Sequence, residues 1–241
     1  MNRIALLVVL SMFVLQGCSQ HGLKPGQDKK KAAQIYSDLG LGYLGQGKVE
    51  LALTKLKRSL QLDNKQVEAH HYIAEVYNQL EEYELADAHY TKAVSLAPPT
   101  PMLLNNYGAF LCERSRFEDA EKYFLRAATT KRYRSPELAY ENLALCALRT
   151  KNTEKAETYF RKALGMNAGL PKSLYQMARL NYDKKDYLRA RAFLQRFQSV
   201  SNDTERSLKL GIHIEKALGS REGEKEYQEK LRRLFPHADS E

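Results

Sequence analysis

The chain has 241 residues, of which 43% are apolar and 28% charged, and this composition excludes a protein that is disordered throughout. It contains only 13 glycines and 7 prolines, whereas β-rich folds need such turn residues at short intervals, so a mostly helical protein is favoured. The net charge is +9, but the basic residues are scattered through the chain beside acidic ones, without a dense basic arm. We therefore predict no nucleic acid partner.

The amino terminus has the form of a bacterial signal peptide. The apolar run at 4–15 is too short to span about 30 Å of hydrocarbon. It ends in Leu-Gln-Gly-Cys at 15–18, which resembles the lipobox, where a small residue precedes a cysteine that is lipidated before cleavage. The sequence predicts a signal peptide over 1–17 and lipidation of Cys18. The alternative is an ordinary secreted protein with a chance cysteine.

The segment after this cysteine bears on localisation. In bacterial lipoproteins a serine in place of aspartate at the next position implies transfer to the outer membrane, so Ser19 predicts a lipid-anchored protein on its periplasmic face. Several acyl chains would hold the protein there, each adding about 0.8 kcal/mol per buried CH₂. Residues 18–31 are polar and include three consecutive lysines, which predicts a flexible tether between the lipid and the folded body.

From residue 32 to residue 241 the chain repeats with a period of 34 residues, apart from small shifts. Five blocks place a small residue in the first half and a large residue in the second half, in the pairs Gly40 and Leu56, Ala74 and Tyr90, Gly108 and Phe124, Ala144 and Phe160, and Ala178 and Leu194. These are positions of the tetratricopeptide pattern, in which the small residue lets two helices approach closely. The predicted repeats cover 33–66, 67–100, 101–134, 137–170, 171–203 and 204–237.

The repeats predict the fold class. A single helical hairpin cannot bury its apolar face alone, so we expect an all-α, right-handed superhelical solenoid of about six hairpins, with a concave surface lined by the first helix of each. The sixth unit is degenerate, because Gly223 stands where an alanine is expected, and terminal repeats that cap a stack often depart from the pattern.

Sequence motifs of catalysis are missing. The chain has no phosphate-binding glycine-rich loop, no HExxH, no CxxC and no nucleophile elbow, so we predict that the protein is not an enzyme and has no catalytic residues, cofactor, metal or small-molecule substrate. His70 and His89 could approach each other in the second repeat, but zinc would need a third ligand there. The alternative is that His70 replaces the large aromatic residue of the pattern and packs in the core.

Cys112 and Cys146 are separated by one repeat length, which puts them at nearly equivalent places on the first helices of neighbouring repeats. In an oxidising periplasm they could form a disulfide if their Cα atoms come within about 7 Å. The alternative is two separate buried thiols.

Family resemblance implies that positions 2, 5, 9, 12 and 13 of each first helix face the concave groove. The expected partner-binding residues are leucines of the first and fourth repeats, namely Leu41, Leu44, Leu138, Leu145 and Leu148. Large apolar side chains on an open groove favour an apolar strand or an amphipathic helix of a protein partner. The second repeat is polar at these positions, His71 among them. The alternative for Leu41 and Leu44 is that they pack against the tether or the second repeat.

The lipobox, the six repeats and the segments at 39–44, 104–108 and 206–212 resemble the pilotins, lipoproteins of type IV pilus biogenesis. The resemblance implies a protein on the inner leaflet of the outer membrane that binds the pilus secretin and helps it to reach that membrane and multimerise, which supports pilus formation and twitching motility. The alternative function is an envelope adaptor lipoprotein that docks peptidoglycan hydrolases or synthesis enzymes through the same groove.

Overall fold

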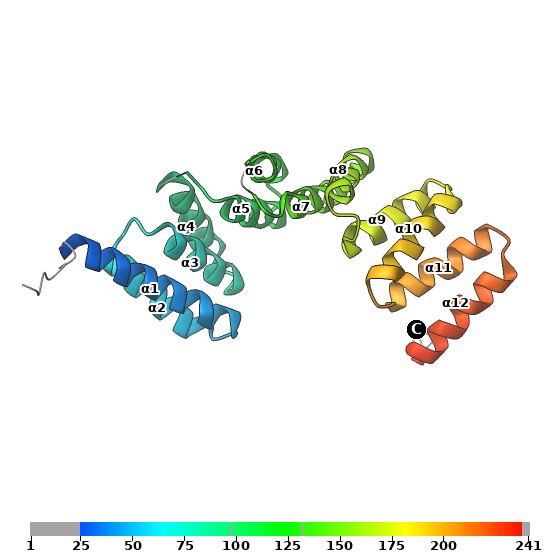
Figure 1. Cartoon of the computed structure of the whole chain (residues 1–241), viewed down its shortest axis with the longest axis horizontal. Helices are drawn as coiled ribbons and strands as arrows, with labels where there is room; N and C mark the ends of the chain where they lie inside the picture. Colours follow the sequence, from blue (N-terminus) through cyan, green and yellow to red (C-terminus); the bar gives the residue numbers. More distant parts are fainter. Residues whose placement is uncertain (1–24, 97, 132, 238–241) are drawn as a thin grey trace, which may run out of the picture. The chain divides into compact units, whose positions relative to one another are not determined.

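The computed structural model describes residues 25–96, 98–131 and 133–237, and within them the chain is all-α (Figure 1). The helices are α1 (Pro25–Gly45), α2 (Val49–Leu62), α3 (Val67–Gln79), α4 (Tyr83–Leu96), α5 (Pro101–Glu113), α6 (Phe117–Ala128), α7 (Pro136–Arg149), α8 (Thr153–Met166), α9 (Pro171–Asp183), α10 (Tyr187–Val200), α11 (Glu205–Ala217) and α12 (Arg221–Leu234). Consecutive helices pair into hairpins, and the predicted tetratricopeptide fold class is confirmed. None of these helices is long and apolar enough to cross a membrane.

The hairpins belong to two compact units, which are described separately. The N-terminal unit extends to Ala93 and contains the first two hairpins except for the end of α4; the C-terminal unit begins at Val94 and contains the other four. In the N-terminal unit α1 packs along α2, and α2 packs against α3. Their shared core consists of Ala52, Leu56, Ala69, Tyr72, Ile73 and Val76.

The small residue of each hairpin is needed because its two helices come very close. In the third hairpin a methyl group added at Gly108 would lie 2.9 Å from ring carbons of Phe124. In the sixth hairpin a methyl group at Gly211 would lie 2.5 Å from ring carbons of Tyr227. Such separations are too short for carbon atoms, so the sixth hairpin keeps the packing rule of the others despite its degenerate sequence.

The turns between the paired helices repeat as regularly as the helices. Each contains one residue with a left-handed backbone, at φ values between 59° and 72°, and these residues are Gly47, Glu81, Ser115, Lys151, Lys185 and Gly219. A left-handed residue at the end of a helix reverses the chain and directs the second helix back along the first. The turn geometry is therefore the same in all six hairpins, although only two of them supply glycine.

The predicted tether over 18–31 requires a correction at its C-terminal end, because α1 already begins at Pro25. The physical reason is local: lysine, glutamine and alanine are good helix formers, and Asp28 in the first turn interacts favourably with the helix dipole. The signal peptide at 1–17, Cys18 and the first part of the tether lie outside the described residues.

Candidate partner-binding surfaces

The two leucines predicted for the first-repeat surface differ in burial. Leu41 is 43% exposed on α1. Leu44 is half-buried and packs against the core of the N-terminal unit, to which α3 contributes Tyr72 and Ile73. The side chain of Leu44 therefore contacts the core that the first and second repeats share.

Two further apolar side chains on α1 are more exposed than the repeat pattern suggests. Ile35 is 59% exposed and Leu39 is 43% exposed, and they lie one helical turn apart. The same two repeat positions are covered elsewhere: Ala69 and Ile73 on α3, Ala139 and Leu143 on α7, and Ser173 and Met177 on α9 are at most 2% exposed. Each of those helices packs against the second helix of the preceding hairpin, whereas no described helix precedes α1. We call Ile35 and Leu39 the open face of α1.

Sequence reasoning missed the open face because the repeat pattern treats both positions as core. The signal that could have identified it is the place of the first repeat in the stack, since a hairpin with no preceding neighbour leaves its neighbour-facing positions uncovered.

In the C-terminal unit, hydrogen bonds on both sides of α7 define the surface that remains open. Asn142 Nδ2 donates to Asn105 Oδ1 on α5 at 3.1 Å. On the other side Glu141 accepts bonds from the backbone N–H and hydroxyl of Ser173, at 3.1 and 2.6 Å. The carboxylate thus satisfies a donor in the first turn of α9, where negative charge is favourable.

The predicted leucines of α7 lie around these bonds. Leu138 is 41% exposed, and Leu145 and Leu148 are half-buried. Glu141 and His71, at the fifth position of their repeats, are buried, so in the second and fourth repeats this position does not line an open groove. The described leucines thus belong to two separate surfaces, one in each unit.

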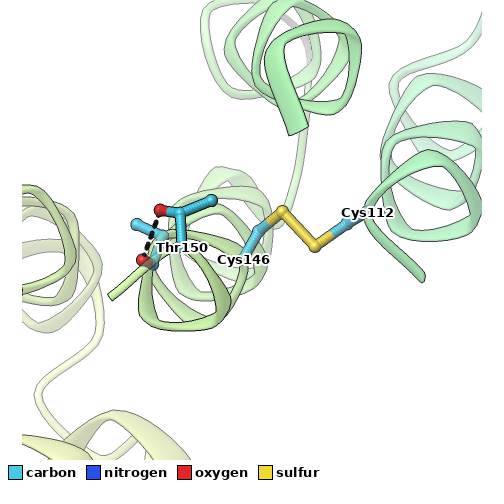
Figure 2. Close-up of a disulfide and its surroundings, with 4 residues drawn as sticks. Cys112, Cys146 and Thr150 are labelled. Carbon is cyan, nitrogen blue, oxygen red and sulfur yellow. Dashed lines mark hydrogen bonds between the residues drawn. A yellow bond between two sulfur atoms is a disulfide. The ribbon is translucent and has the colours of Figure 1, made fainter. Parts of the chain in front are cut away.

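The disulfide predicted as one of two alternatives is present in the structure (Figure 2). Cys112 of α5 and Cys146 of α7 have bonded sulfur atoms at 2.08 Å, and their Cα atoms are 5.9 Å apart. Figure 2 also shows Thr150 just after α7, where its hydroxyl donates to the carbonyl oxygen of Ala147 at 2.8 Å. The disulfide holds the first helices of the third and fourth hairpins together.

The two histidines of the second repeat do meet. His70 Nδ1 and His89 Nδ1 are 3.0 Å apart, and His70 Nε2 lies 3.2 Å from the carbonyl oxygen of Asn64. If His70 donates to that carbonyl, its Nδ1 accepts the proton of His89 Nδ1, so both rings are neutral. Burial lowers the pKa of both; that of His89 falls to about 4, with smaller contributions from His70 and Lys57. Within the described ranges no three histidine, cysteine or acidic side chains gather into a possible metal site.

Comparison with known proteins places this geometry in a family. The tetratricopeptide repeat model matches residues 99–169, and a model of YpiA-like C-terminal tetratricopeptide repeats matches 68–128. The type IV pilus assembly protein PilF of Pseudomonas aeruginosa is 35% identical over 236 residues, which are 96% of this chain and 94% of that protein.

Solved structures of type IV pilus proteins have the same fold. The P. aeruginosa pilF structure matches with a TM-score of 0.80 at 35% identity, covering 87% of this chain and 94% of that one. The structure of PilW, described as a widely conserved type IV pilus biogenesis factor, matches with a TM-score of 0.75 at 27% identity, covering 86% and 95%. The chain therefore belongs to the PilF family of type IV pilus assembly proteins, which is built from tetratricopeptide repeats.

Proposed function

We propose that this protein is a non-catalytic, lipid-anchored scaffold on the periplasmic face of the outer membrane, where it binds the type IV pilus secretin and promotes its localisation and multimerisation. Its family supports a role in pilus assembly. The structural observation that carries the proposal is the open face of α1, because Ile35 and Leu39 present apolar surface at positions that other hairpins cover with a helix.

The proposed mechanism needs no reaction. An anchored scaffold raises the effective concentration of its partner at the membrane, and it can cover apolar partner surface until the secretin ring closes. The open face of α1 suits an amphipathic helix, since it occupies the place of the preceding helix in a stack of hairpins. Leu41 is a further exposed apolar residue on the same helix.

A pair of variants tests this contact. Ile35→Glu with Leu39→Glu should lower the amount of secretin multimer in outer membranes, while the thermal midpoint stays nearly unchanged, because exposed substitutions usually alter stability by no more than about 0.5 kcal/mol each. The matched control is Met166→Glu with Leu188→Glu, which changes two exposed apolar residues of the C-terminal unit (55% and 68% exposed). A stable α1 variant with full multimer levels would exclude the open face as the contact.

Deletion of the gene separates the proposal from the alternative function. Loss of surface pili and twitching with normal cell shape is the expected result for a secretin scaffold. Defects of shape or division with intact pili would instead favour an adaptor that docks peptidoglycan enzymes.

A further inference from the structure

The C-terminal unit has an open surface of its own on the first helices of its hairpins. On α7, Asn142 hydrogen-bonds to α5 and Glu141 hydrogen-bonds to α9. The strip of the α7 surface between these two residues therefore faces neither neighbouring helix, and we call it the line of α7. Leu138 and Leu145 lie on this line, because seven residues span two helical turns and return the side chain to the same face. Leu138 is exposed and Leu145 is half-buried.

The character of this line changes from one helix to the next. On α5 the equivalent residues are Met102, which is 48% exposed, and Ala109, so α5 and α7 are both apolar here. On α9 the 34-residue repeat puts Lys172 and Arg179 at the places of Leu138 and Leu145. Within the described ranges, neither of these exposed cations forms an ion pair or a hydrogen bond.

The surroundings of Arg179 make it a suitable anchor for a ligand. Tyr175 and Tyr182 lie four residues before it and three residues after it, so they flank it on the surface of α9. Both rings are half-buried and pack against another ring. The ring centroids of Tyr175 and Phe197 are 5.9 Å apart, and those of Tyr182 and His213 are 6.2 Å apart. Fixed tyrosines beside an arginine are the residue types that contribute most to protein interfaces.

We infer that this surface of α5, α7 and α9 binds an extended segment of a partner protein in which apolar side chains are followed, about three residues later, by an aspartate or glutamate. Packed helices are about 8–10 Å apart and an extended chain advances about 3.3 Å per residue, so three residues reach from one helix to the next. The apolar side chains would contact Leu138 and Leu145, and the carboxylate would contact Arg179 or Lys172. The inference deepens the proposed function, on which it rests, because it specifies what the partner presents.

The limited width of the cationic region favours a protein segment over a membrane surface. Beyond α9 the equivalent residues of α11 are Glu205 and Ile212, and Asp183 follows Arg179 by one turn on α9 itself. The cations are thus bordered by acidic residues on two sides and by leucines on a third. This arrangement suits one or two carboxylates beside apolar side chains, whereas an anionic bilayer attracts clusters of four to eight basic residues.

Peptide binding to the full-length protein in detergent tests the inference. The probe is a fluorescent ten-residue peptide, blocked at both ends, with leucine at positions 3 and 6, glutamate at position 9, and serine or glycine elsewhere. The matched peptide has lysine at position 9. We expect the glutamate peptide to bind more tightly, and Lys172→Glu with Arg179→Glu to weaken it about tenfold while strengthening the lysine peptide.

Two further variants control for charge and for apolar contact. Arg232→Glu with Arg233→Glu on α12 changes the net charge equally at exposed positions outside the surface, and it should leave both peptides unaffected. Leu138→Ser should weaken both peptides. Equal binding of the two peptides, equal effects of the two charge variants, or no binding of the glutamate peptide up to about 1 mM would overturn the inference.

Four other results would assign the surface differently or separate the two proposals. Binding to phosphatidylglycerol vesicles that depends on Lys172 and Arg179, without peptide binding, would overturn the inference in favour of lipid. Self-association that the same double variant abolishes would overturn it in favour of a second copy. If the wild-type protein retains secretin in pull-downs but binds neither peptide, the inference fails and the proposed function stands. If it binds the glutamate peptide with the expected charge dependence but retains no secretin, the surface stands and the proposed function fails.

Discussion

Gly211 shows how strongly a single residue can control a hairpin. Its Cα faces the ring of Tyr227, and an added methyl group would lie 2.5 Å from the ring carbons. A shift of the Tyr227 ring would cost a hydrogen bond, because its hydroxyl donates to Gln198 Oε1 at 2.9 Å. Burial, and after it the nearby acidic groups, raises the pKa of this tyrosine to about 12.

Gly211→Ala should therefore destabilise the protein by about 1–3 kcal/mol, the usual cost of an extra methyl group in a packed interior. The control is Gly165→Ala on α8, where nothing lies within 4 Å of the new methyl group, so only helix propensity changes and stability should rise by about 0.5–1 kcal/mol. Urea unfolding of both variants measures the difference. Equal effects at the two glycines would contradict the close approach of α11 and α12.

The histidine pair predicts a pH dependence. In the unfolded chain His89 titrates near 6.5, whereas in the folded protein its pKa is lowered to about 4, so the unfolded state binds the proton first as pH falls. The stabilisation from the neutral ring is complete above pH 6.5 and is lost as pH falls towards 4. Because the ring is partly exposed, we expect a loss of about 1–2 kcal/mol.

The variant His89→Gln removes this titration while keeping a polar side chain. Its free energy of unfolding should change less between pH 7.5 and pH 4.5 than that of the wild type, and the difference should fall within the window given above. Parallel pH profiles for the two proteins would show that the pair does not titrate as described.

At the scale of elements, spacing predicts the hairpins well and their exposure less well. Alternation of a small and a large residue, as in Ala144 and Phe160, identifies both helices of a repeat because close packing requires it. Exposure depends on neighbours as well as on the pattern. Leu39 is exposed because no described helix covers it, and Leu44 packs on the core although its repeat position is assigned to the groove.

Other elements differ from expectation for equally local reasons. The helix α1 begins before the predicted end of the tether, because a run of lysines is both a solvated linker and a good helix former. Glu141 and Ser173 pair between repeats, and a pattern of single repeats cannot indicate such a contact. The disulfide could be proposed from its spacing, but choosing between a bond and two thiols required the 5.9 Å separation of the Cα atoms.

The Cys112–Cys146 disulfide leads to a prediction at this scale. It closes a loop of 34 residues between α5 and α7, so replacing both cysteines by serine should cost about 2–4 kcal/mol, mainly because the unfolded chain gains freedom. Unfolding of the variant, compared with wild type under oxidising and reducing conditions, tests this. Mass spectrometry of unreduced peptides provides the control, and two alkylatable thiols in freshly isolated native protein would contradict the bridge.

At the scale of the whole molecule, the two units offer different chemistry to a partner. The open face of α1 is apolar, whereas the line across α5, α7 and α9 joins leucines to unpaired cations within the described part of the chain. A scaffold with two unlike surfaces can engage two segments of one partner, and linked contacts raise the overall affinity beyond that of either alone. Combining the α1 variant with the Lys172 and Arg179 variant would show whether the two surfaces act on the same secretin.

Membrane attachment is predicted from the sequence, and Cys18 is the residue on which it depends. The apolar run at 4–15 is too short to cross a bilayer, so the acyl chains on this cysteine would be the anchor. Cys18→Ser should leave the protein in the soluble fraction, with the fold of residues 25–237 unchanged as judged by circular dichroism. Ser19→Asp is the control, because it keeps the lipid and by the known sorting pattern should move the protein to the inner membrane. If Cys18→Ser still sedimented with outer membranes at the wild-type yield, lipidation would not be the anchor.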